Sequence, residues 1–185
     1  MIRGRRRILK AGGILAAWPA LALWPRWSRG GQVAADRQQR IALRNLHTGE
    51  RLEVEYLRDA AYLPDAFEAI ARLLRDFRTG EQHAIDPALM DYLVAVAAAI
   101  GAPPEFGVIS GYRSPQTNEQ LHARSSGVST HSLHMQGRAI DVRIAKVDCA
   151  DLAACAQGLQ RGGVGYYRSS DFVHLDTGNF RSWRG

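Results

Sequence analysis

Two short segments near residue 50 alternate apolar and polar side chains. They span residues 40–46 and 51–57, and the tetrapeptide His-Thr-Gly-Glu separates them. Alternation with a period of two places every second side chain on one face of a strand, so that face can be buried while the other meets water. Because the separating residues are typical of a turn, the two segments are predicted to form a β-hairpin.

In the region that follows, the apolar residues recur with the spacing of a helix. In residues 63–78, large apolar side chains recur three or four positions apart, which predicts a helix with one apolar face. A second helix is predicted over residues 86–101, because Asp86 suits the N-cap, Pro87 the first helical position and Gly101 the C-terminal cap. The chain is thus predicted to pass from paired strands to two successive helices.

The second half of the chain is predicted to alternate strands and helices around one loop. In order, these are a buried strand at 106–110, a helix that begins at Ser114-Pro115, an irregular loop at 125–137, a strand at 138–144, a helix at 149–160 and a closing pair of strands at 163–167 and 171–178. The whole pattern predicts an α+β fold, with a small antiparallel sheet and helices packed on one side.

Length and composition fit one globular domain. The 185 residues contain 46% hydrophobic and 23% charged side chains, which is ordinary for soluble proteins. The chain is also long enough to bury a core of its own. We expect a single domain over residues 41–185, preceded by a polar linker at 31–40 and a distinct N-terminal segment at 1–30.

The positive charge of the chain is concentrated in that N-terminal segment. The formal net charge is +6, but residues 1–30 hold seven of the 24 basic residues and none of the 18 acidic ones, which leaves 17 basic and 18 acidic residues elsewhere. A body so close to neutral lacks the basic surface on which nucleic-acid binding depends. We therefore expect no nucleic-acid partner.

The N-terminal segment joins a basic run to a short apolar stretch. Residues 5–10, Arg-Arg-Arg-Ile-Leu-Lys, resemble the twin-arginine export signal. The apolar residues 11–25 are interrupted by Pro19 and are too few to span a bilayer as a helix. A basic tail before a membrane anchor is the alternative interpretation. An export signal over residues 1–30 predicts a periplasmic or cell-envelope protein that contacts the membrane only through an uncleaved signal.

Cys149 and Cys155 are the only cysteines of the chain. An exported location permits a disulfide, but a spacing of six residues around the start of a helix is unfavourable for the geometry of one. A pair of reduced, buried thiols is therefore the favoured interpretation, and a disulfide is the alternative.

The strand predicted at 138–144 contains an aspartate where strands favour apolar or β-branched residues. If its side chains alternate, Asp141 points away from the core and has only a small neighbour on its own face. Gly137 allows a tight turn before the strand, so His134 can fold back over Asp141. Taken alone, Asp141 is better interpreted as a carboxylate that pairs with Arg143 or is solvated.

The closing strand adds a second histidine and a second carboxylate. His174 and Asp176 alternate with apolar residues, so both are expected on the face opposite to the core, about 6–7 Å apart along the strand. Two histidines and a carboxylate on the strands of one sheet can form a zinc shell that keeps a fourth position for water. The two strands together therefore predict a metal site.

Three stretches of the chain resemble the zinc D-alanyl-D-alanine carboxypeptidases and murein endopeptidases, whose fold is shared with the hedgehog signalling domain. They are Ser-Gly-Tyr-Arg-Ser at 110–114, Ser-Leu-His-Met-Gln-Gly-Arg-Ala-Ile-Asp at 132–141 and the closing strands over 163–178. The resemblance covers residues 40–185 and is strongest to the exported branch first known as a bacterial domain of unknown function. It implies the same α+β fold and a zinc peptidase.

The resemblance also implies roles for individual residues. The family pattern Ser-x-His-x-x-Gly-x-Ala-x-Asp falls on Ser132 to Asp141, which implies Ser132 in substrate binding and both His134 and Asp141 as ligands of Zn2+. The last metal histidine of the family falls on His174, and its substrate-clamping arginine falls on Arg113.

The catalytic base is the point at which this chain departs from the family. Many relatives have a glutamate three residues before the last metal histidine, or a histidine two residues before it, but this chain has Asp171 and Phe172 there. We favour Asp176, which is expected on the metal face, over Asp171, whose side chain points away from His174 by strand parity. His131 is interpreted as a loop residue or an outer partner of the site.

These residues predict a zinc metallopeptidase that hydrolyses an amide bond in peptidoglycan stem peptides or cross-links. Zinc would polarise the carbonyl and activate water, while a carboxylate moves the proton. A zinc-stabilised cell-wall binding module without activity is the alternative. His-Leu-Asp at 174–176 also resembles part of the metal motif of non-haem iron oxygenases. That resemblance implies another histidine far downstream, and only nine residues follow Asp176, so we do not expect an oxygenase. A D,D-cross-link, an L,D-cross-link and a terminal D-alanine all suit the same site.

Overall fold

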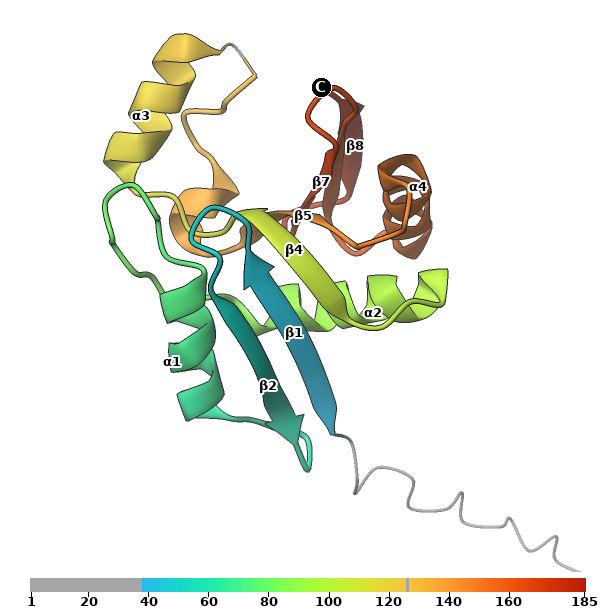
Figure 1. Ribbon diagram of the computed structural model, residues 1–185. Helices are drawn as coiled ribbons and strands as arrows, with labels where there is room; N and C mark the ends of the chain where they lie inside the picture. The colour runs from blue at the N-terminus through green and yellow to red at the C-terminus, as the bar shows by residue number, and fades with distance from the viewer. Residues whose placement is uncertain (1–37, 126) are drawn as a thin grey trace, which may run out of the picture. The chain divides into compact units, whose positions relative to one another are not determined.

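The structure, a computed structural model, describes residues 38–125 and 127–185. Within these residues, eight strands form one mixed sheet, accompanied by four α-helices and one short 3-10 helix (Figure 1). None of these helices is long and apolar enough to cross a membrane, and the predicted export signal at 1–30 lies outside the described residues. The elements are β1 (Gln39–Asn45), β2 (Arg51–Arg58), β3 (Ala61–Tyr62), α1 (Pro64–Leu73), α2 (Pro87–Ile100), β4 (Glu105–Ser110), α3 (Pro115–Arg124), η1 (Leu133–Gln136), β5 (Ala139–Arg143), α4 (Cys149–Leu159), β6 (Gly163–Tyr167), β7 (Phe172–Asp176) and β8 (Arg181–Arg184).

The strands follow the order β3-β2-β1-β4-β5-β7-β6-β8 across the sheet. Most neighbours are antiparallel, but β1 pairs with β4, and β6 with β8, in parallel. The α+β class is therefore confirmed, whereas the expectation of a small antiparallel sheet is wrong in size and in strand direction. Parallel neighbours need a crossover connection. Helices α1 and α2 lie between β1 and β4 in the chain, and β7 lies between β6 and β8, so neither parallel pair produces a local sequence pattern.

The first two strands form the predicted hairpin. They pair antiparallel with Leu43 opposite Leu52, and the side-chain oxygen of Asn45 accepts two backbone N–H groups of the turn between them. β1 begins at Gln39, inside the segment predicted as a linker, because the backbone there already pairs with β2.

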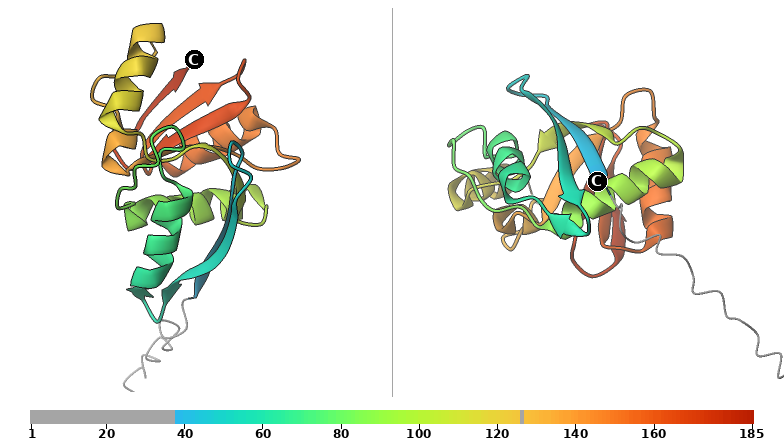
Figure 2. Two further views of the ribbon diagram at one scale, coloured as in Figure 1. Left: turned by 60° about the vertical axis from the view of Figure 1, so that its left-hand side comes forward. Right: turned by 90° about the horizontal axis from the view of Figure 1, so that it is seen from below.

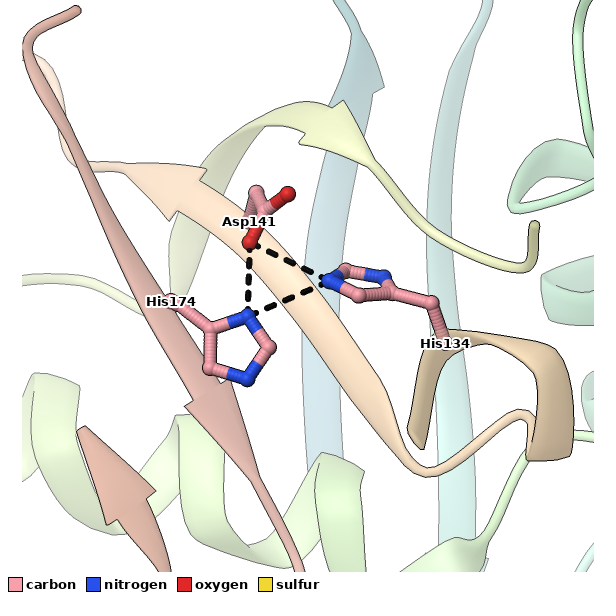
Figure 3. Close-up of side chains that lie close together, drawn as sticks. All are labelled: His134, Asp141 and His174. Atoms are coloured by element: carbon pink, nitrogen blue, oxygen red, sulfur yellow. Dashed lines mark hydrogen bonds and ion pairs between the residues drawn. The ribbon is translucent and has the colours of Figure 1, made fainter. Parts of the chain in front are cut away.

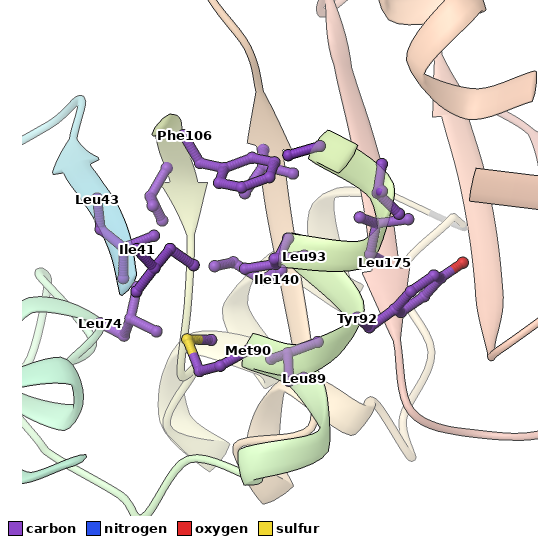
Figure 4. Close-up of a cluster of buried hydrophobic side chains, with 14 of the residues drawn as sticks. Ile41, Leu43, Leu74, Leu89, Met90, Tyr92, Leu93, Phe106, Ile140 and Leu175 are labelled. Atoms are coloured by element: carbon purple, nitrogen blue, oxygen red, sulfur yellow. The ribbon is translucent and has the colours of Figure 1, made fainter. Parts of the chain in front are cut away.

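One face of the sheet is covered by α1, α2 and α4, and the hydrophobic core lies between them (Figures 1, 2 and 4). Ile140 on β5 and Leu175 on β7 supply the sheet side of this core, and Leu93 on α2 packs against it; all three are 0% exposed. Because side chains alternate along a strand, the residues between them, including Asp141 and His174, lie on the opposite face. We call this opposite side the open face.

The predicted ends of α2 are confirmed, whereas the predicted end of α1 is wrong. α2 has the predicted caps, since Asp86 accepts a backbone N–H at its start and Gly101 is left-handed at its end. α1 ends at Leu73, five residues before the predicted end at 78. Beyond it, the carbonyl of Leu74 accepts the backbone N–H of Tyr112 at 2.7 Å. The chain therefore leaves the helix to meet the end of β4.

The two cysteines lie on α4 as free thiols. Cys149 is buried, and burial is the main cause that raises its pKa to about 12. Cys155 is half-buried, with its Sγ 3.9 Å from the carbonyl oxygen of Val96 on α2. A thiol with a raised pKa, such as that of Cys149, stays protonated and unreactive. The structure thus agrees with the interpretation of reduced thiols, but only one of the two is buried.

Candidate metal centre

Three side chains from different elements converge on the open face (Figure 3). His134 lies on η1, Asp141 on β5 and His174 on β7. His134 Nε2 is 3.1 Å from His174 Nδ1 and 3.3 Å from Asp141 Oδ1, and the last two atoms are 2.9 Å apart. The structure thus brings together the three residues that the resemblance implied as metal ligands.

The local backbone explains this convergence. β5 and β7 are antiparallel neighbours with Asp141 directly opposite His174, so the two side chains leave the sheet side by side. Gly137 ends η1 in the left-handed conformation with a φ of 64°, and a Cβ atom there would overlap the carbonyl of Ala84. Only glycine suits this position, and the turn it makes folds His134 over Asp141 as predicted.

Hydrogen bonds outside the cluster select which nitrogen of each histidine faces it. His134 Nδ1 donates to the carbonyl of Gly111 at 2.7 Å, and His174 Nε2 donates to Asp176 Oδ2 at 3.0 Å. Because a carbonyl and an ionised carboxylate can only accept, the protons lie on these outer nitrogens. The inner nitrogens, His134 Nε2 and His174 Nδ1, then face each other and Asp141, an arrangement that a proton or a metal ion between them would stabilise.

The spacing of the cluster suits a metal ion of the size of zinc. Tetrahedral ligands at the ~2.0–2.1 Å typical of zinc lie about 3.3 Å from one another. The three separations here range from 2.9 to 3.3 Å. His134 and Asp141 are buried and the His174 side chain is only 12% exposed. The position between them is therefore shielded on most sides and open toward one cavity.

The charge of the cluster also favours a cation. Burial opposes the ionisation of Asp141, but the adjacent His134 and His174 hold its pKa well below the usual range. Burial lowers the pKa of His134. Burial acts on His174 in the same direction, yet its bonds to Asp141 and Asp176 raise its pKa to about 9. Asp176 is buried too, and its hydrogen bonds with His174 and an arginine lower its pKa. Two ionised carboxylates thus flank His174 and attract a proton or a metal ion.

A cavity of about 300 Å³ adjoins the cluster. The loop after α3, residues 127–133, forms one side of it, and both Ser132 and His131 line it there. The resemblance implied Ser132 in substrate binding, and its place on the wall agrees with contact to a ligand. His131 was interpreted as a loop residue or an outer partner; it is exposed and lies on the wall of the cavity, outside the cluster of three ligands.

Arg113 lines the same cavity at the end of β4. Its side chain is only 11% exposed, and its contacts are long: 3.5 Å to Asp141 Oδ2, 3.4 Å to Ser110 Oγ and 3.5 Å to Asn118 Oδ1. Its Nε has no hydrogen-bond partner among the described residues, and burial lowers its pKa. A largely buried guanidinium with so few short hydrogen bonds retains donors for an additional anion.

Asp76, which the sequence analysis missed, anchors the turn that carries Arg113. It is 2% exposed and accepts both the backbone N–H and the hydroxyl of Ser114, at 2.9 and 2.7 Å. Ser114 Oγ in turn accepts the backbone N–H of Thr117 as the N-cap of α3. The contact between Asp76 and Ser114 spans 38 positions of sequence, so no local pattern could indicate it.

Neither carboxylate that we predicted as the base lines the cavity. Asp176 lies beside His174 on the predicted face, but it is 0% exposed, and each of its oxygens accepts at least two hydrogen bonds. Asp171 is exposed in the turn before β7 and pairs with Arg143 at 3.0 Å. The expectation that Asp176 faces the metal position is therefore corrected, because it lies behind His174 with its oxygens fully used.

An aromatic wall next to His174 was also missed. The ring of Trp183, on β8, lies 5.2 Å from the His174 ring, and its Nε1 donates to the hydroxyl of Tyr167 at 3.1 Å. Tyr167 stacks on Phe172. A Cβ atom at Gly165, the partner of His174 on β6, would overlap the Trp183 ring. The glycine in Gly-Val-Gly-Tyr-Tyr was the available signal, but its partner strand β8 was not predicted.

The fold and the site together define a class. Two histidines and one carboxylate that could hold a metal ion lie beside a cavity lined by a largely buried arginine, which is the arrangement that metal-dependent hydrolases use. Comparison with known protein families identifies the kind of hydrolase. Residues 33–183 match the peptidase family M15_2, whose model is described as peptidoglycan L,D-endopeptidase MepK. The chain belongs to this peptidase family, which confirms the family that the motifs indicated.

Named relatives are similar over nearly their whole length. The chain is 36% identical over 179 residues to the peptidoglycan L,D-endopeptidase MepK of Escherichia coli K12, a match that covers 97% of this chain and 96% of that protein. It is 36% identical over 184 residues to the probable peptidoglycan L,D-endopeptidase MepK of Haemophilus influenzae, covering 99% and 97% of the two chains. No solved structure gives a significant match.

Proposed function

We propose that this protein is a zinc-dependent peptidoglycan L,D-endopeptidase that remodels the cell wall. The observation that carries the proposal is the cluster of three side chains, in which His134 Nε2 and His174 Nδ1 face Asp141 at a spacing that suits zinc. Membership of the peptidase family and the names of the two relatives support it. The same names favour the L,D-cross-link among the three substrates that the sequence left open.

Zinc is the metal that this donor set favours. Two imidazole nitrogens and one carboxylate are typical zinc ligands, whereas Mg²⁺ and Ca²⁺ prefer shells of oxygen. His134, Asp141 and His174 would hold the ion and leave its fourth position toward the cavity. When bound, zinc supplies the polarisation of the substrate carbonyl and the activation of water.

Arg113 is proposed to bind a substrate carboxylate. Stem peptides of peptidoglycan carry free carboxylates beside their amide bonds, and a planar guanidinium can bind both oxygens of one carboxylate. Arg113 lies on the cavity with unused donors, and its Nη2 is 3.5 Å from the ligand Asp141. A carboxylate held there would lie beside the metal position. Ser132, which lines the same cavity, is proposed to contact the same substrate.

Proton transfer is proposed to involve His131. The two predicted carboxylates are directed elsewhere, and Asp141 is a metal ligand, so the described cavity wall has no other carboxylate. Histidine is the side chain best suited to accept and return a proton near neutral pH. His131 is exposed and lines the cavity, and its Nδ1 lies 3.1 Å from the hydroxyl of Thr130.

The proposed place of action is the periplasm or cell envelope, where peptidoglycan lies. Residues 5–10 resemble a twin-arginine signal, so we propose export by that route. Export of an already folded chain would allow the metal to be inserted before the protein leaves the cytoplasm.

The proposed function is tested by digestion of two defined muropeptide dimers, one with an L,D-cross-link and one with a D,D-cross-link. Mass spectrometry should show the zinc-loaded protein converting only the L,D-linked dimer to monomers, and His174→Ala, which lacks a ligand, should convert neither. Cleavage of the D,D-linked dimer alone would contradict the proposed specificity. Binding of zinc and peptidoglycan without cleavage of either dimer would instead indicate the non-catalytic module.

A further inference from the structure

Asp176 lies on the far side of the His174 ring from the metal position. His174 Nδ1 faces Asp141 at 2.9 Å, and His174 Nε2, on the other side of the ring, faces Asp176 Oδ2 at 3.0 Å. The two carboxylates therefore hold the imidazole between them. Asp176 is itself paired with Arg181, whose two terminal nitrogens donate at 2.7 and 3.1 Å.

The chain is built to enclose this carboxylate. The backbone N–H groups of Gly163 and Gly178 donate to Asp176 Oδ1 at 3.1 and 2.8 Å. A Cβ atom at Gly163 would overlap the carboxylate, and one at Gly178 would lie 2.9 Å from its Oδ1. Two glycines from separate segments thus leave the space that the carboxylate fills. A fully buried group with this many dedicated donors has a fixed position.

The arrangement matches the way in which proteins orient metal-binding histidines. A carboxylate that accepts the outer N–H of such a ring fixes its tautomer and orientation and makes its inner nitrogen a better ligand. A general base, by contrast, has to reach the proton that it removes, and Asp176 does not line the cavity. Arg181 donates to both oxygens and so holds the carboxylate in one orientation.

We propose that Asp176, held by Arg181, is a positioning residue that prepares His174 to bind the metal. The proposal rests on the proposed function for the identity of the ion, but it concerns the affinity for zinc and does not require cleavage of any substrate. It differs from the base role expected from the sequence in one measurable respect: loss of a base leaves the metal in place, whereas loss of a positioning residue weakens metal binding.

Asp176→Asn is the direct test. Asparagine retains one acceptor for His174 but turns an N–H₂ group toward the donors of Arg181 and Gly163. The dissociation constant for zinc, measured by competition with a chromophoric chelator, should rise about 10- to 100-fold, the range for outer partners of metal ligands. Cleavage lost at limiting zinc should return when zinc is in excess. Asp171→Asn removes an exposed carboxylate nearby and should leave zinc affinity unchanged.

Two further variants keep the test decisive if Asp176→Asn does not fold. Arg181→Gln alters a side chain that is 48% exposed and should weaken zinc binding about tenfold, the lower end of the same range. Gly163→Ala places a methyl group against the carboxylate without changing any charge and should also weaken binding. Its matched control is Gly158→Ala on α4, where nothing lies within 4 Å of the added atom.

The outcomes separate this inference from the proposed function. Wild-type zinc affinity in Asp176→Asn, with turnover lost even at excess zinc, would restore the base role and overturn the proposal. If Asp176→Asn does not fold, zinc affinity within twofold of wild type in both Arg181→Gln and Gly163→Ala overturns it as well. Weakened zinc binding in these variants, in a protein that cleaves neither dimer, would uphold the proposal while the proposed function fails.

Discussion

The substitution of Arg113 by lysine separates a substrate clamp from a structural arginine. Lysine keeps the positive charge, but its ammonium group cannot offer two parallel N–H donors to one carboxylate. The existing contacts of Arg113, to Asp141, Ser110 and Asn118, are 3.4 to 3.5 Å long, so their loss should cost the fold little. The effect of the change should therefore fall on the substrate.

The magnitude follows from the number of donors lost. Removing one of two charge-assisted hydrogen bonds to a carboxylate costs roughly 1.5–3 kcal/mol, which corresponds to a fall in kcat/KM of about 10- to 150-fold. Zinc content and thermal stability should stay close to those of the wild type. Arg58→Lys is the matched control, because Arg58 pairs with Glu55 on the surface of β2 and should change kcat/KM by less than about twofold.

The assay compares two substrates, the L,D-linked dimer and an analogue in which the carboxylate beside the cut bond is amidated. The wild type should lose activity on the amidated dimer, while Arg113→Lys should show a smaller difference between the two. If Arg113→Lys cleaves both dimers as the wild type does, the arginine is structural and our account of substrate binding is wrong.

Three further predictions concern other parts of the chain. His131→Gln should lower kcat by about 10²- to 10⁴-fold with zinc retained, and wild-type kcat would exclude it as the proton carrier. Burial opposes ionisation of Asp76, yet hydrogen bonds with Thr117 and Ser114 lower its pKa. The stabilisation it provides is therefore present above its unfolded pKa near 4 and is lost as the pH falls through the lower folded pKa. Asp76→Asn should thus reduce the free energy of unfolding by roughly 2 kcal/mol at pH 7, with the difference from wild type shrinking in urea titrations at lower pH; an equal difference throughout contradicts this. Changing Arg5 and Arg6 together to lysine should retain the protein in the cytoplasm by cell fractionation, and normal export argues against the twin-arginine route.

Most of the individual elements could be predicted because they carry their own local signals. The β1–β2 hairpin follows from alternation, and the ends of α2 follow from Asp86 and Gly101. β8 was missed since it is a four-residue strand with two arginines and pairs in parallel with β6. The direction of strand pairing depends on contacts between distant segments, which periodicity does not record.

The metal site, too, could be predicted only in part from the sequence. His134, Asp141 and His174 stand out because polar residues interrupt regular patterns and the motif fixes their spacing. Strand parity correctly placed Asp176 on the face of His174, but parity says nothing about what covers a side chain. In the structure, Gly163 of β6 and Arg181 of β8 donate hydrogen bonds to the Asp176 carboxylate, which is fully buried. A hydrogen-bond partner on another strand, such as Arg181 on β8, therefore cannot be predicted from the sequence pattern around Asp176.

The central claim is that His134, Asp141 and His174 hold one zinc ion on which cleavage depends. The most direct test measures zinc by elemental analysis and cleavage of the L,D-linked dimer in the same samples, before chelation, after chelation and after zinc is restored. We predict one zinc per chain, loss of both metal and cleavage on chelation, and recovery of both with zinc. A wild-type protein that binds no zinc, or that cleaves the dimer equally well after the metal is removed, would contradict the account.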